Sequence, residues 1–114
     1  MAHVSSGDRV AVGAKFLDGR FRGWYLRVCE HTLDNASCKL DVLGQLYGNY
    51  WVGVARLKIS PQGEERMGFN SISHSTHPRR NEEVKLLTES WKEAIRERKA
   101  KRASCNPGAV SLSV

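Results

Sequence analysis

Residues 50–59 read Tyr-Trp-Val-Gly-Val-Ala-Arg-Leu-Lys-Ile, and this stretch decides the predicted fold. Residues rich in β propensity alternate here between two faces, which is typical of a half-buried strand. The face predicted to pack on helices comprises Trp51, Gly53, Ala55, Leu57 and Ile59. The opposite face begins with Val52 and Val54 and ends with Arg56 and Lys58. We therefore predict a strand whose basic end lies on an exposed sheet face.

The chain before this stretch predicts a β-hairpin. Residues 9–17 alternate weakly and end in Asp18-Gly19, a dipeptide that favours a hairpin turn. Residues 20–29 are aromatic and rich in β formers, with a bulge expected at Gly23. After residue 60, we expect a turn over 61–65 and a further strand over 66–76.

Helical spacing predicts two helices. Apolar residues recur through 36–47, with Asp34-Asn35 as the cap and Gly48 as the terminating residue, although a strand here stays an alternative. Residues 81–102 predict a longer helix, with acidic residues in its first turn and basic residues in its last. Its apolar stripe comprises Val84, Leu87, Trp91, Ala94 and Ile95.

These elements predict an α+β fold in the order β-β-α-β-β-α. It would contain a mostly antiparallel sheet with helices packed on one face. We expect one α+β domain over residues 8–103, a disordered N-terminus over 1–7 and a flexible tail over 104–114.

The composition favours an anionic partner inside the cell. Eighteen Lys and Arg residues against twelve Asp and Glu give the 114-residue chain a formal charge of +6, which attracts phosphate backbones or anionic lipid. Three cysteines do not form a secreted disulfide framework, and neither a signal peptide nor a membrane span is evident. We expect a cytoplasmic protein without a membrane partner.

Motifs for catalysis are lacking. The sequence shows no phosphate loop, nucleophile elbow or paired-carboxylate motif, so we expect neither an enzyme nor a small-molecule substrate or cofactor. Cys29, His31 and Cys38 could bind zinc together with His74 or His77, but their spacing matches no recognised zinc module. We therefore expect no metal site.

The basic residues gather in particular segments, and this arrangement predicts a nucleic-acid interface. Cations beside small hydroxyl groups suit the phosphates and 2′-hydroxyls of a duplex, and a helix start suits a phosphate. The predicted interface comprises Arg20, Arg22, Trp24, Arg27, Arg56, Lys58, Gln62, Ser71, Ser73, Ser75, Arg79 and Arg80. We expect the cations of the last helix to pair instead with its own glutamates.

The three tryptophans are expected to differ in role. Trp51 and Trp91 fall on apolar stripes and are predicted core residues. Trp24 lies among arginines, where it could stack on a base or on a duplex end, with core packing the alternative.

Three blocks of sequence resemble the tombusvirus-type suppressors of RNA silencing. They are Tyr25-Leu26-Arg27, then the residues from Ala36-Ser37 through Val42-Leu43-Gly44 and Gly48 to Ala55-Arg56, then Ala94-Ile95-Arg96 with Lys99. The resemblance implies a homodimer with one continuous sheet that sequesters short double-stranded RNA without reading bases. The positions that fit the family's contacts are Arg22, Arg27, Gln62, Ser71, Ser73 and the region 78–81. Long members measure duplex length with N-terminal tryptophans that this chain lacks, so we expect weak length preference.

A small β-barrel is the alternative. Residues 7–12 and the turn at Asp18-Gly19 also resemble the opening of a Tudor or SH3-like module. Such a module would bind a methylated or Pro-rich peptide in a cage formed by Trp24, Tyr25 and Trp51. It requires a strand over residues 39–46.

Overall fold

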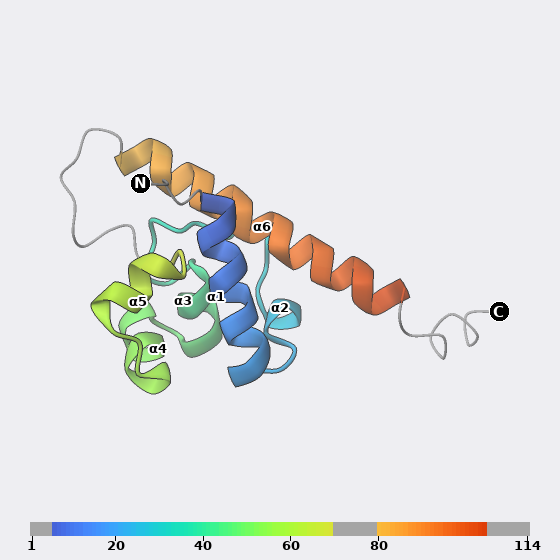
Figure 1. The fold of residues 1–114 in the computed structure, drawn as a ribbon, viewed down its shortest axis with the longest axis horizontal. Helices are drawn as coiled ribbons and strands as arrows, with labels where there is room; N and C mark the ends of the chain where they lie inside the picture. Colours follow the sequence, from blue (N-terminus) through green and yellow to red (C-terminus); the bar gives the residue numbers. More distant parts are fainter. Residues whose placement is uncertain (1–5, 70–79, 105–114) are drawn as a thin grey trace.

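The structure is a computed structural model that describes residues 6–69 and 80–104. Every regular element in these two ranges is a helix, so the predicted α+β fold with its antiparallel sheet is wrong for this part of the chain. The elements are α1 (Ser6–Arg20), α2 (Trp24–Arg27), α3 (Val42–Tyr47), α4 (Tyr50–Leu57), α5 (Pro61–Arg66) and α6 (Arg80–Ser104) (Figure 1).

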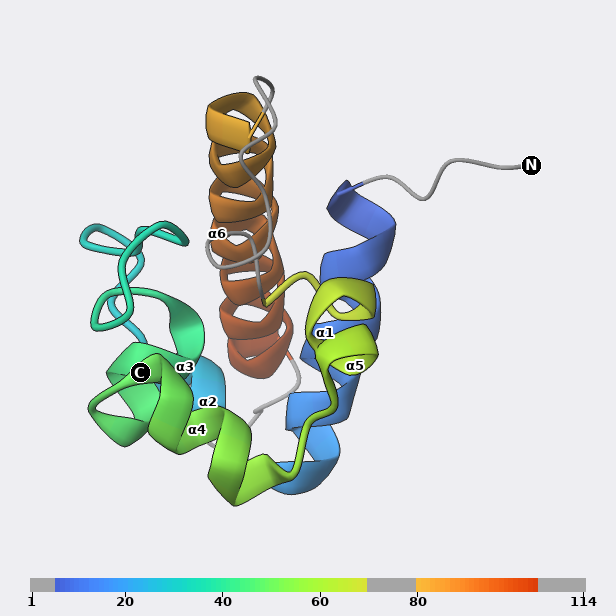
Figure 2. The same cartoon turned by 90° about the vertical axis from the view of Figure 1, so that its left-hand side faces the viewer.

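The two long helices, α1 and α6, form the centre of the fold. They lie side by side (Figures 1 and 2). Helix α5 packs against α1, whereas α2 packs against α6 and α3 packs against α4. Helix α1 buries Val10, Ala14 and Leu17, which recur at helical spacing. Helix α6 buries the stripe predicted from the sequence, Val84, Leu87, Trp91, Ala94 and Ile95. The predicted C-terminal helix is therefore confirmed.

Polar contacts join α1 to α6 near both ends of the pair. The guanidinium of Arg9 lies 3.5 Å from the carboxylate of Glu83, and that of Arg98 lies 2.8 Å from the carboxylate of Asp18. Residue numbers rise in the same direction along both helices, so the helices are parallel. The Trp24 indole also donates a hydrogen bond to Asp18, at 2.9 Å, and this bond ties α2 to the pair.

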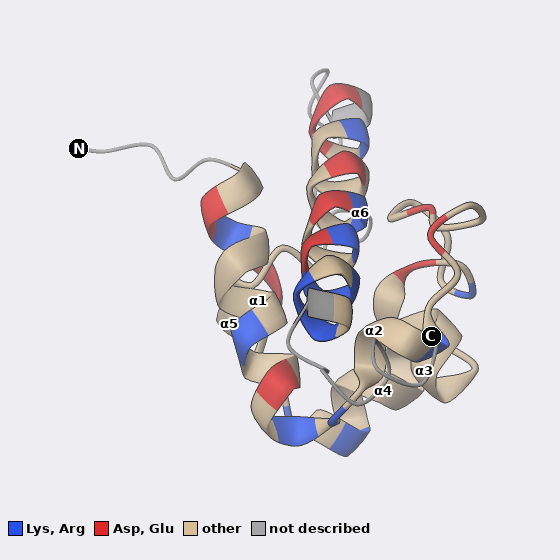
Figure 3. Cartoon of the chain, turned by 90° about the vertical axis from the view of Figure 1, so that its right-hand side faces the viewer, with Lys and Arg blue, Asp and Glu red and all other residues tan. Residues whose placement is uncertain are grey.

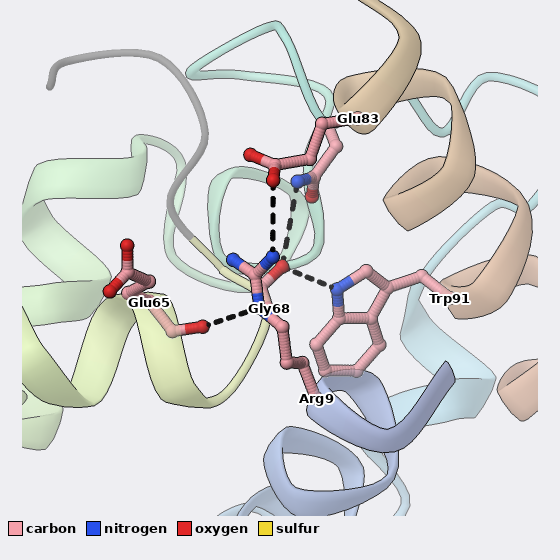
Figure 4. A network of polar contacts seen from close by, with 6 residues as sticks. Arg9, Glu65, Gly68, Glu83 and Trp91 are labelled. Atoms are coloured by element: carbon pink, nitrogen blue, oxygen red, sulfur yellow. Dashed lines mark hydrogen bonds and ion pairs between the residues drawn. The ribbon is translucent and has the colours of Figure 1, made fainter. Parts of the chain in front are cut away.

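The contact of Arg9 with Glu83 belongs to a wider polar network that links α1, α6, α5 and the segment after α5 (Figure 4). The Arg9 side chain donates to the Glu65 carbonyl oxygen at 2.8 Å, which links α1 to α5. The Trp91 indole donates to the Gly68 carbonyl oxygen at 2.9 Å. Trp91 also stacks on Phe69 and meets Trp24 edge-on. This one residue of α6 therefore contacts both α2 and the segment that follows α5.

The predicted strand over residues 50–59 is helix α4. Its buried residues are Tyr50, Gly53 and Leu57, which share one face of a helix and not one face of a strand. The Asn49 side chain caps the helix by accepting a hydrogen bond from the Trp51 amide at 2.8 Å. Because Gly53 has no side chain, α4 packs closely on α3; a Cβ there would lie 2.9 Å from that of Leu43. Burial and capping thus outweigh the β propensity of the valines.

The predicted helix over residues 36–47 is shorter than expected. Asp41 and not Asp34-Asn35 caps it, and its side-chain oxygen accepts a hydrogen bond from the Gly44 amide at 2.6 Å. Gly48 ends it as predicted, with a φ of 88° that favours glycine. The strand that the barrel alternative requires over residues 39–46 is absent, because this stretch contains the turn before α3 and most of α3 itself.

The predicted N-terminal hairpin and the predicted turn at 61–65 are also helical. Helix α1 continues through Asp18-Gly19 to Arg20, and Gly23 adopts a φ of 73° before α2 where a bulge was expected. Pro61 begins α5, a position where its missing amide hydrogen costs nothing. Of the predicted strand over 66–76, residues 66–69 end α5 and lead away from it, and residues 70–76 lie outside the described residues.

Candidate nucleic-acid interface

The structure exposes most of the predicted interface residues that it describes. The exposed ones are Arg20, Arg22, Arg27, Arg56, Lys58 and Gln62. Arg80 is the first residue of α6, and its side chain is not described; Ser71, Ser73, Ser75 and Arg79 lie outside the described residues. Trp24 is fully buried and faces the core, so it presents no surface to a ligand.

Two of the exposed arginines lie over aromatic rings at the end of α1. The Arg20 guanidinium is 5.1 Å from the centre of the Phe16 ring, and that of Arg27 is 5.8 Å from the centre of the Phe21 ring. Both rings are partly buried against the core. These cation–π contacts restrict the arginine side chains, so less conformational entropy is lost when they bind a ligand.

A further aromatic contact extends this group to α3 and α4. The Phe21 ring meets the Tyr47 ring edge-on, with the ring centres 5.7 Å apart. Burial raises the pKa of the Tyr47 hydroxyl, and the positive charge of nearby Arg56 acts in the opposite direction. The contacts of Arg27 with Phe21 and of Phe21 with Tyr47, together with the effect of Arg56 on Tyr47, place Arg27 and Arg56 in the same region although they are 29 positions apart in the sequence.

We call this group the arginine cluster: Arg20, Arg22, Arg27 and Arg56 with their supporting rings Phe16, Phe21 and Tyr47. Arg22 belongs to it because it lies in the short turn that joins α1 to α2. Figure 3 shows basic positions along the lower edge of the molecule, where α1 and α4 end. The cluster therefore combines residues from the end of α1, the α1–α2 turn, α2, α3 and α4.

The charges of the cluster are available to a ligand. Among the residues that the structure describes, the ion pairs use Arg9, Lys92, Arg96 and Arg98, and none of these belongs to the cluster. On α6, only Lys92 pairs with a glutamate of its own helix, Glu89, while Arg96 and Arg98 pair with Glu30 and Asp18 of other segments. Arg96 and Arg98 of the last helix thus contribute to the fold and not to the cluster.

The sequence missed one exposed aromatic residue. Trp51 was predicted to be a core residue, yet 48% of its surface is exposed, whereas Trp24 and Trp91 are fully buried. Helical periodicity is the signal that could have predicted this exposure, because Trp51 lies on a different face of α4 from the buried residues Gly53 and Leu57.

The structure shows no metal centre in the ranges it describes. It brings no group of three or more potential metal-binding side chains together there, and Cys29 and Cys38 are free thiols. His74 and His77, the remaining candidate zinc ligands, lie outside those ranges.

Comparison with known proteins adds no identification. Neither the protein-family models, nor the curated proteins, nor the solved structures gave a match to this chain. No helix within residues 6–69 and 80–104 is both long and apolar enough to cross a membrane. The function is therefore inferred from the geometry and charge of the chain itself.

Proposed function

We propose that the protein binds the phosphate backbone of a nucleic acid through the arginine cluster. The observation that carries this proposal is that exposed Arg20 and Arg27 each lie over a partly buried ring, with exposed Arg22 between them in the chain and exposed Arg56 close enough to Tyr47 to affect its pKa. A guanidinium presents a planar fork of donors that matches phosphate oxygens, and it stays charged at every physiological pH. The formal charge of +6 would add long-range attraction.

Duplex RNA is the specific ligand that we propose, following the sequence resemblance. The sheet implied by that resemblance is absent from the described residues, so the support comes from the arginines and not from a concave sheet. Sequestration of short duplexes, suppression of RNA silencing and a homodimer are further parts of this proposal. They rest on the resemblance alone.

The first experiment measures binding of duplex RNA, duplex DNA and single-stranded RNA by fluorescence anisotropy across a salt series. The test variant replaces Arg20, Arg22 and Arg27 with Ala. The control variant replaces Lys39, Arg66 and Lys85, three exposed cations outside the cluster, so that both variants lose the same charge.

We expect the cluster variant to lose at least about tenfold in affinity and the control to lose much less. Because each lost phosphate contact lowers the slope of log K against log salt by about 0.9, the cluster variant should lose about 2 to 3 in slope. Equal losses in both variants would contradict the proposal and indicate a nonspecific polycation. Preference for duplex RNA over the other two ligands would support the RNA assignment.

A further inference from the structure

Helix α4 has one face in the core and an apolar face that is exposed. The buried face comprises Tyr50, Gly53 and Leu57. On the other side, 48% of Trp51 and 44% of Val52 are exposed, and Ala55 beside them is exposed as well. We call Trp51, Val52 and Ala55 the α4 outer face.

The α4 outer face belongs to an anchored helix. The Trp51 amide is bound to the Asn49 cap, and the Trp51 ring meets the Tyr50 ring edge-on at 4.9 Å. The Tyr50 hydroxyl in turn donates a 2.5 Å hydrogen bond to the carboxyl group of Glu64, inside the fold. The exposed indole is therefore presented by a fixed scaffold and not by a frayed end.

The chain segment that carries this face has charges of one sign only. Residues 42–63 contain no Asp or Glu, and their only charged residues are Arg56 and Lys58, both exposed. Arg56 is on α4 itself, and Lys58 caps its C-terminal end. The C-terminal end of α1, which bears Arg20, lies at the same lower end of the molecule (Figures 2 and 3). The outer face is thus an apolar strip bordered by cations.

We infer that the α4 outer face docks on an anionic lipid surface, which goes beyond the proposed nucleic-acid binding and departs from the expectation of no membrane partner. Trp51, Val52 and Ala55 would lie in the interface between headgroups and acyl chains, while Arg56 and Lys58 contact anionic headgroups. Indole rings favour this interface because they have an apolar body and a polar N–H group. The helix would lie on the bilayer and not cross it.

Two other occupants fit the face less well. Nucleobases stack on aromatic rings, but Val52 and Ala55 offer no ring. A second copy of the chain, docked through the same face about a twofold axis, would bring Arg56 and Lys58 near their own symmetry mates. A bilayer with anionic lipid satisfies both the apolar strip and the cationic border.

The test uses the full chain with phosphatidylcholine vesicles that contain or lack phosphatidylserine. Since Trp24 and Trp91 are fully buried, changes in tryptophan emission report mainly on Trp51. We expect a blue shift and quenching by brominated acyl chains with the anionic vesicles only. An unchanged spectrum with anionic vesicles would overturn the inference. A shift produced by RNA or by raising the protein concentration, but not by vesicles, would also overturn it.

Cosedimentation with vesicles tests whether binding depends on the α4 outer face or on exposed apolar side chains in general. The test variant is W51S/V52S, and the matched control is V12S/L86S, which removes two exposed apolar side chains from α1 and α6. We expect at least about tenfold weaker vesicle partition for the test variant only, with unchanged helix content by circular dichroism. Equal partition of the two variants would contradict the inference.

RNA affinity of W51S/V52S distinguishes this inference from the proposed function. W51S/V52S keeps all four arginines of the cluster, so this variant should bind RNA as the wild type does. If the wild type binds vesicles but no RNA, the proposed function fails and the inference stands. If it binds RNA but no vesicles, the inference fails and the proposed function stands.

Discussion

The parallel pair of α1 and α6 and the group of short helices α3, α4 and α5 use carboxyl groups in opposite ways. In the long pair, Asp18 lies at the surface, where two guanidinium nitrogens of Arg98 donate to it at 3.0 and 2.8 Å. The hydrogen bond from Arg98 lowers the pKa of Asp18, with a further contribution from the Trp24 indole. The charged form of this carboxyl group is therefore the one that stabilises the fold.

In the short-helix group, two carboxyl groups are buried, those of Asp41 and Glu64. Asp41 is only 1% exposed, and its bonding partner is the Gly44 amide, which carries no net charge. Burial raises the pKa of Asp41 to about 8. Glu64 is similarly buried against the Tyr50 hydroxyl, and burial together with Glu64 raises the pKa of Tyr50. Rising pH should therefore stabilise the α1–α6 pair, through Asp18, and destabilise the short-helix group, through Asp41.

The largest expected effect comes from removing Trp91, the α6 residue that contacts Trp24 of α2 and also Gly68 and Phe69 in the segment after α5. Trp91→Ala should lower the free energy of unfolding by about 3 to 5 kcal/mol, because it removes a fully buried ring and leaves a cavity. Chemical denaturation measures this change. Leu86→Ala, at a residue of α6 that is 59% exposed, is the control and should change stability by at most about 0.5 kcal/mol. Similar losses in the two variants would show that Trp91 is not a core residue.

The next effect sharpens the contrast at Asp41. Its pKa in the folded state, about 8, lies above the ordinary value of 3.8, so the folded state retains a proton that the unfolded chain releases. Stability from this group is complete below pH 3.8 and is lost as the pH rises toward 8, by at most about 1.4 kcal/mol per pH unit. Asp41→Asn should flatten this dependence in denaturation curves between pH 5 and 8. Identical slopes for variant and wild type would refute the prediction.

The smallest effect is expected at Asp18, with the opposite sign. Because its pKa is lowered in the folded state, its stabilisation is present above its ordinary value of 3.8 and is lost as the pH falls below it. Since 43% of the side chain is exposed, solvent screens the pair, and Asp18→Asn should cost only about 1 kcal/mol at pH 7. The stability difference between variant and wild type should shrink toward pH 3. A difference that grows in acid would contradict this reasoning.

Local chemistry predicted the part of the fold where several signals agree. The apolar stripe of α6, its acidic start and its basic end all indicate one helix, and the structure confirms it. Gly48 likewise ends a helix in the sequence and in the structure, because a positive φ there needs glycine.

The strand prediction for residues 50–59 is wrong because their apolar residues fit both the two-residue period of a strand and the 3.6-residue period of a helix. Val52 and Val54 favour a strand, whereas Tyr50, Gly53 and Leu57 recur at helical spacing and are the residues that the core buries. The cap residue Asn49 is the local signal that favours the helix. Packing against α3 decides between the two, and that contact depends on Gly53, whose role only the folded structure reveals.

The candidate interface was predictable in its residues and not in its arrangement. Arg20, Arg22 and Arg27 are exposed, as a run of arginines between apolar residues suggests. Their connection to Arg56 runs through the Phe21–Tyr47 contact, which joins segments that are distant in sequence. No local pattern specifies such a contact. For the same reason, the sequence left core packing of Trp24 as one of two alternatives, since its partners Asp18 and Trp91 belong to other helices.

The parallel arrangement of α1 and α6 also constrains the order of folding. Arg9 and Glu83 are 74 residues apart, and Asp18 and Arg98 are 80 apart, so the central pairing closes a loop of most of the chain. Contacts between distant residues form slowly because chain entropy is lost before they are made. During synthesis, α1 must wait for the last helix to leave the ribosome. We therefore expect α3 and α4, which are neighbours in sequence, to associate first, and the long pair to close over them in the final step.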